Sequence, residues 1–101
     1  MAELIWSERA ISDIENIYDY IALDSLMYAR LTSESIIDSV ERLQGFPESG
    51  RHLPEFSQMP YKEVTIGNYR VIYKYDSGTN EVKIVTVVHG SRLLTKEILS
   101  E

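Results

Sequence analysis

Cysteine is absent from this chain of 101 residues, and only two histidines are present. Without cysteine the protein has no disulfide, no zinc–thiolate site and no thiol nucleophile. His52 and His89 lie far apart in the sequence and lack the surrounding carboxylates of a metal site, so we expect neither a metal ion nor a cofactor. A glycine-rich phosphate-binding loop is missing as well. The lack of cysteine fits a reducing cytoplasm, which is where we expect the protein to act.

Long apolar runs and an excess of basic charge are also missing. No apolar run approaches the roughly 20 residues of a membrane-spanning helix, and the first residues show no signal-peptide pattern, so we expect no membrane partner. The formal net charge is -6, and the acidic excess lies in the first half of the chain. A chain of this charge is not expected to coat nucleic acid, which needs a basic face.

What is present is the composition of an ordinary globular protein. Hydrophobic residues make up 44% of the chain and charged residues 26%, which excludes a disordered or low-complexity class. The length predicts a single domain over residues 1–101. For its tail, residues 92–101, the sequence does not decide between a short helix and loose order.

Two segments in the first half have the periodicity of amphipathic helices. Ser7 has the side chain of an N-cap, and apolar residues then recur at helical spacing over residues 10–21. Either Asp24 or Ser25 can cap a second helix, which should end near residues 45–47, a Gly-Phe-Pro segment. The short connection predicts an antiparallel helical hairpin.

The strands are predicted from runs rich in Val, Ile, Tyr and Thr. These runs lie at residues 62–66, 69–75 and 82–88, and residues 2–6 are expected to form a further short strand. Gly67-Asn68 predicts a tight hairpin turn, and residues 76–80 a longer one in which Gly78 supplies a positive φ. The predicted fold class is α+β with the order β-α-α-β-β-β, a helical hairpin packed on a small, mainly antiparallel sheet.

Alternation along the last two strands predicts a second sheet face that is also apolar. If the helices cover one face, this second face stays open for a partner, unless the C-terminal tail or a second copy of the chain covers it. The residues expected at this partner-binding surface are Arg70, Ile72, Lys74, Val85 and Val87, with Arg92 just beyond the last strand.

Four segments follow one another in a characteristic order and spacing: Ile5-Trp6-Ser7-Glu8-Arg9-Ala10, Leu43-Gln44-Gly45-Phe46-Pro47, Gly67-Asn68-Tyr69-Arg70-Val71-Ile72-Tyr73 and Val85-Thr86-Val87-Val88-His89-Gly90-Ser91-Arg92. Together they resemble the RelE/ParE family of toxins over about residues 4–92. The resemblance implies the same β-α-α-β-β-β fold. It also implies a bacterial type II toxin–antitoxin toxin that arrests growth and is neutralised by a cognate antitoxin. Both a homo-oligomer and a toxin–antitoxin heteromer remain open.

Within this family the resemblance implies two targets. ParE-like members inhibit DNA gyrase and need no catalytic residues of their own. RelE-like members cut mRNA on the ribosome with several Lys and Arg and a C-terminal Tyr. Here no tyrosine follows Tyr75, glycine follows His89 where the YoeB-like branch has an aromatic residue, and the isoelectric point is about 4.9. These departures favour DNA gyrase as the target.

The alternative is a ribosome-dependent mRNA endoribonuclease of the YoeB-like kind. The resemblance would then make Glu55 the general base, Arg70 the phosphate clamp and His89 the general acid. Each residue also has a structural interpretation: Arg70 can pair with an acid such as Glu63, Glu55 can pair with Arg51, and His89 can be a hydrogen-bonded strand end. A third possibility is a non-toxic interaction module of the same fold.

Overall fold

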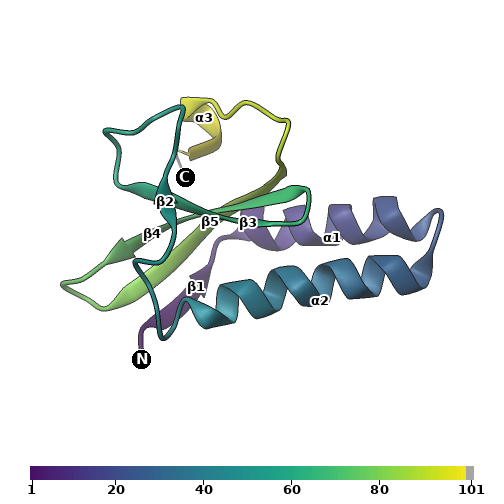
Figure 1. Ribbon diagram of the computed structural model, residues 1–101, viewed down its shortest axis with the longest axis horizontal. Coiled ribbons are helices and arrows are strands. Elements are labelled where there is room, and N and C mark those ends of the chain that lie inside the picture. The colour runs from purple at the N-terminus through teal and green to yellow at the C-terminus, as the bar shows by residue number, and fades with distance from the viewer. Residues whose placement is uncertain (100–101) are drawn as a thin grey trace.

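Three helices and five strands make up the computed structural model, which describes residues 1–99 (Figure 1). In chain order they are β1 (Glu3–Trp6), α1 (Glu8–Ala22), α2 (Leu26–Arg42), β2 (Arg51–His52), β3 (Tyr61–Ile66), β4 (Tyr69–Asp76), β5 (Glu81–His89) and α3 (Lys96–Leu99). The sheet has the order β1-β5-β4-β3-β2, with β1 parallel to β5 and the other neighbours antiparallel. This arrangement confirms the predicted α+β fold. In the described part of the chain, no helix combines the length and apolar character needed to cross a membrane.

The helical hairpin begins at the predicted caps. The Ser7 hydroxyl accepts a hydrogen bond from the Ala10 amide at 3.0 Å. At the second helix Ser25, rather than Asp24, is the N-cap, and its hydroxyl accepts from the Tyr28 amide at 3.1 Å. Since each cap satisfies an amide that the first helical turn leaves unpaired, these serines set where α1 and α2 begin.

The first hydrophobic core lies between this hairpin and one face of the sheet. Ala10 of α1 and Ile36 and Val40 of α2 pack against Val71 and Tyr73 of β4, and all five are fully buried. Tyrosines of β4 therefore face the helices, as alternation predicts.

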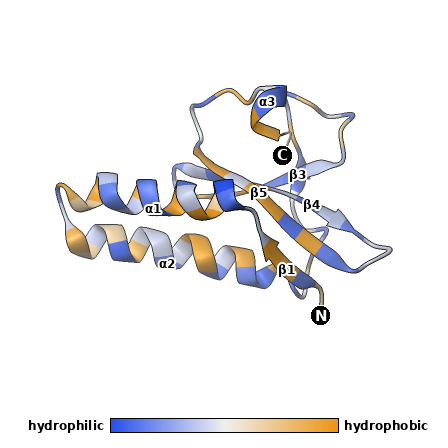
Figure 2. Ribbon diagram, turned by 180° about the vertical axis from the view of Figure 1, so that it is seen from behind, coloured by the Kyte–Doolittle hydropathy of each residue, from blue (hydrophilic) through white to orange (hydrophobic). Residues whose placement is uncertain are grey.

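A second core covers the opposite face of the sheet, so the expectation of an open second face is wrong. α3 lies on the far side of the sheet from α1 and α2 (Figure 1), and Figure 2 shows the same arrangement from behind. Ile72 and Val85, expected at the open surface, are buried there. They pack in a cluster whose buried residues are Leu53, Ile72, Val85, Val88, Leu94, Ile98 and Leu99. In the tail, residues 92–101, a short helix forms over Lys96–Leu99, while residues 100–101 lie outside the described part.

A bulge in β5 changes which residues share a face. Ile72 pairs with Thr86 and Tyr73 pairs with Ile84, so Val85 is an extra residue between them. The extra residue reverses the alternation beyond it, and Val87 packs into the helix-side core instead of sharing a face with Val85. The prediction that Val85 and Val87 lie on one surface is therefore wrong.

Of the two predicted hairpin turns, one agrees with the prediction and one differs in detail. Gly67 has a positive φ of 56°, as expected of the tight turn between β3 and β4, whereas in the β4–β5 loop the positive φ belongs to Asn80 rather than to Gly78.

The short strand β2 was not predicted. It starts after Gly50, whose amide donates to the Tyr73 hydroxyl at 2.9 Å. A Cβ at Gly50 would lie 2.5 Å from that oxygen, so only glycine fits there.

Asp13 ties α1 to the strand beyond the bulge. Its carboxylate accepts a hydrogen bond from the Val87 amide at 2.9 Å and a second, short one from the Thr86 hydroxyl. We expect Asp13→Ala to lower the free energy of unfolding by about 1–3 kcal/mol, because it leaves both donors without their acceptor. Urea unfolding followed by circular dichroism measures this, with the exposed Asp19 of the same helix as the control in Asp19→Ala. Equal losses in both variants would contradict the assignment.

Candidate functional site

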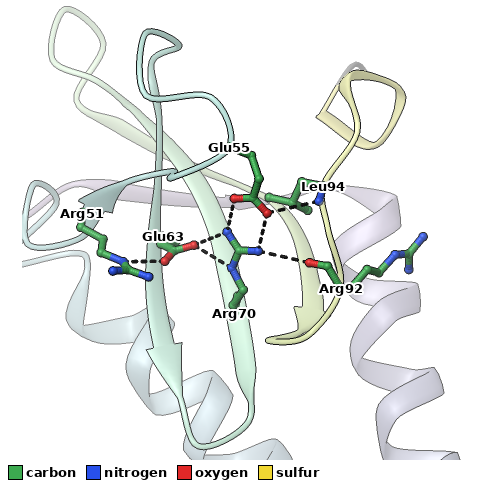
Figure 3. Close-up of polar contacts among 6 residues, drawn as sticks. All are labelled: Arg51, Glu55, Glu63, Arg70, Arg92 and Leu94. Atoms are coloured by element: carbon green, nitrogen blue, oxygen red, sulfur yellow. Dashed lines mark hydrogen bonds and ion pairs between the residues drawn. The ribbon is translucent and has the colours of Figure 1, made fainter.

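Arg70 lies at the centre of a buried ion cluster on the tail side of the sheet (Figure 3). Its side chain projects from β4 and is only 8% exposed. Nη1 and Nη2 donate to the two carboxylate oxygens of Glu55, each at 2.8 Å, which is a bidentate pair. Nε donates to Glu63 at 2.7 Å. The guanidinium thus has two carboxylate partners, and the anticipated pairing of Arg70 with Glu63 is confirmed.

Glu63 is the second acid of the cluster and is fully buried. It projects from β3, and its side chain is 0% exposed. Its second carboxylate oxygen, Oε2, accepts a hydrogen bond from Nε of Arg51 at 2.6 Å. Strand register explains this contact, since Arg51 of β2 pairs directly with Glu63 of β3. The anticipated pairing of Arg51 with Glu55 is therefore not the one that forms.

Glu55 links the C-terminal segment to this cluster. Its Oε2 accepts from the Leu94 amide at 3.3 Å, and Nη1 of Arg70 donates to the Arg92 carbonyl, also at 3.3 Å. The Arg70 guanidinium lowers the pKa of Glu55 to about 2, and the carboxylates in turn raise the pKa of Arg70. At neutral pH Glu55 is a carboxylate whose two oxygens are already engaged, so in this state it is a poor general base.

His89 lies on the other face of the sheet. Its ring meets Tyr69 edge to face, with 5.6 Å between the centroids, and Tyr69 packs against the helix-side core. Nδ1 accepts from the Ser91 amide at 3.1 Å, which leaves the proton of the neutral ring on Nε2. Because β5 has switched faces beyond its bulge, the structure brings Glu55 and Arg70 together and keeps His89 apart from them.

The remaining residues expected at a partner surface separate into two groups. Ile72, Val85 and Val87 are buried in the two cores and present no surface in this conformation. Lys74 is partly exposed beside the Tyr61 ring, and Arg92 is exposed. Figure 3 shows the Arg92 guanidinium directed away from the cluster, although its carbonyl contacts Arg70.

The accessible side of this cluster is an open hollow of about 450 Å³ between the β2–β3 region and the C-terminal segment. Both Arg51 and Arg92 contribute to its lining, and both side chains are exposed. Arg70 forms part of its floor, already paired with Glu55 and Glu63. The hollow is therefore suited to binding an acidic group through the exposed arginines more than through Arg70.

Known proteins share both this sequence pattern and this fold. The model of a family described as "ParE toxin of type II toxin-antitoxin system, parDE" matches residues 4–94. The chain belongs to the ParE toxin family. A relative, the toxin RelE2 of Caulobacter vibrioides, is 29% identical over 93 residues, which cover 92% of this chain and 100% of that protein.

Two solved structures have a similar fold. The chromosomal ParDE system of P. aeruginosa has a TM-score of 0.71 at 24% identity, over 88% of this chain and 96% of that chain. The RelBE2 toxin–antitoxin complex of Mycobacterium tuberculosis has a TM-score of 0.65 at 18% identity, over 87% and 96%. The toxin-family resemblance and the fold it implied are thus confirmed.

Proposed function

We propose that this ParE-family chain arrests growth by binding DNA gyrase and catalyses no reaction of its own. The observation that carries the proposal is the separation of His89 from Glu55 and Arg70, the other two side chains that a ribonuclease would use. Glu55 is held by Arg70, Arg70 is buried, and His89 faces the helices. A base, a phosphate clamp and an acid have to meet at one phosphodiester, so this separation favours a binding function. The net charge of -6 also favours a protein target over ribosomal RNA.

The second proposed partner is a cognate antitoxin, met in the cytoplasm. Support comes from the relatives, since the M. tuberculosis structure is a toxin–antitoxin complex. Of the residues expected at the partner surface, Lys74 and Arg92 remain accessible, and the exposed side chain of Arg51 adds a third cation. We expect an acidic polypeptide segment to contact these side chains.

Induction of the protein in cells without antitoxin separates the candidate targets. We expect loss of plasmid supercoiling, DNA-damage signalling and no transcript cuts within translated regions. The purified protein should inhibit supercoiling by purified gyrase. His89→Ala should leave growth arrest unchanged, because His89 lies apart from Arg70 and serves no catalytic step.

Two results would contradict the gyrase proposal. Transcript cuts that disappear in a folded His89→Ala variant would identify a ribonuclease that uses this histidine. Normal growth at full expression of folded protein would identify a non-toxic interaction module. Circular dichroism of the purified variants provides the folding control for both results.

A further inference from the structure

The far end of the helical hairpin is apolar and exposed. α1 and α2 extend well past the end of the sheet (Figure 1), and Figure 2 shows hydrophobic residues at the turn that joins them. Six large side chains in this region are between 51% and 82% exposed. They are Tyr20, Leu23, Leu26, Met27, Tyr28 and Leu31, and are called the hairpin tip below.

The tip is exposed because the sheet ends before the helices do. Tyr20 shares one hollow with Tyr69 at the start of β4, and Tyr28 and Leu31 share another with Ile66 and the same tyrosine. These hollows mark the step at which the β3–β4 turn stops and the hairpin continues. Tip side chains beyond that step have no strand to cover them.

The exposed side-chain area of the hairpin tip is comparable to the area that one partner buries in a specific protein–protein interface. Singly scattered surface hydrophobics are normal, but six large exposed side chains gathered at one end of a helical hairpin are typical of an interaction site. Six side chains of this size, each more than half exposed, present on the order of 800 Å², which is what each partner of a standard interface buries. The tip is therefore large enough to support a stable dimer.

The charges of the tip favour a second copy of the chain as its occupant. Although the net charge of the chain is -6, residues 20–31 contain one acid, Asp24, and one base, Arg30, both exposed. In a two-fold dimer a contact of Asp24 with Arg30 of the other copy forms twice, once on each side of the axis. Arg30 is available for this, since its contact with Glu34 is an exposed pair at 3.9 Å and contributes little.

We propose that two copies of this chain dimerise through their hairpin tips, which bury each other's apolar side chains in a four-helix arrangement. The Arg70 cluster lies on the opposite face of the sheet from the hairpin and stays accessible in such a dimer. The proposal therefore does not depend on which target the toxin binds.

Sedimentation velocity over a concentration series tests the dimer directly. The wild-type protein should dimerise with a dissociation constant in the micromolar range. Leu26→Glu combined with Met27→Glu should weaken dimerisation at least ~10-fold, because two apolar contacts at the centre of the interface are replaced by charges. The matched control is Phe46→Glu, which adds charge at an equally exposed side chain beyond the other end of α2 and should leave the dimer intact.

A charge exchange tests the two-fold arrangement itself. Asp24→Arg alone should weaken the dimer by placing two cations together, and addition of Arg30→Asp should restore it. A wild-type protein that stays monomeric at its highest soluble concentration would overturn the proposal. So would a dimer that the tip variants leave intact, or tip variants that change only antitoxin binding.

Discussion

Arg70→Ala should lower the free energy of unfolding by about 3–5 kcal/mol, which makes it the most destabilising change expected in the ion cluster. Arg70 is the shared partner of Glu55 and Glu63. Its removal leaves Glu63 fully buried with Arg51 as its remaining cation, and it leaves Glu55 without an ionic partner. A buried charge deprived of its partner loses far more than an exposed one.

Urea unfolding followed by circular dichroism measures this loss. Arg30→Ala is the control, since it breaks an exposed pair and should cost less than about 0.5 kcal/mol. Arg70→Met combined with Glu63→Leu should recover part of the stability, because it replaces the two most buried charges of the cluster by apolar side chains of similar volume. Equal stability of Arg70→Ala and wild type would mean that the cluster does not hold the fold together.

The same expectation bears on functional assays. A loss of growth arrest in Arg70→Ala is expected from unfolding alone and does not demonstrate catalysis. His89→Ala is the more informative variant, because His89 lies at an exposed strand end and contacts Ser91 and Tyr69.

Glu55 should make the stability of the protein depend on pH in the acidic range. Its pKa is about 2 in the folded protein, against an ordinary value of 4.5, because the Arg70 guanidinium favours the charged form. A lowered pKa stabilises the fold at any pH above the ordinary value, and the stabilisation is lost as the pH falls through 4.5 towards 2. The shift corresponds to about 3 kcal/mol at neutral pH.

Comparison of wild type with Glu55→Gln isolates this contribution from that of the other carboxyl groups. The difference in unfolding free energy should be close to its full value at neutral pH and should shrink towards zero near pH 2. Glu15→Gln, at an exposed position of α1, should show no such trend. A wild-type advantage over Glu55→Gln that stays constant with pH would contradict the assignment.

Local sequence signals predicted most of the fold. The helical hairpin follows from 3.6-residue periodicity and the serine caps, and β3, β4 and β5 follow from β-branched and aromatic runs, each within one residue of its observed bounds. The pairing of Arg70 with Glu63 was also anticipated, because an acid on the neighbouring strand is a simple cross-strand partner for an arginine.

The two failures that bear most on the site have physical causes that local patterns do not report. Val85, Val87 and Val88 are all apolar, so nothing in the sequence shows that Val85 is the extra residue that moves Val87 and His89 to the helix side. Whether the second sheet face is covered depends on how the C-terminal segment packs against it. Leu94 and Ile98 stand four residues apart, which is a weak signal that this segment is a helix with an apolar face. The segment is also held to the sheet by the hydrogen bond from the Leu94 amide to Glu55, which is distant in the sequence.

The parallel pairing of β1 with β5 constrains when the chain can fold. Glu3–Trp6 finds its hydrogen-bonding partner only at residues 81–84, and the Ser7 hydroxyl donates to the Val85 carbonyl, 78 positions later. The first strand cannot be placed until nearly all of the protein has been synthesised, so the complete sheet forms late in translation or after it. Premature termination before β5 would leave a helical hairpin with its apolar face uncovered, a product open to proteolysis rather than a shortened toxin.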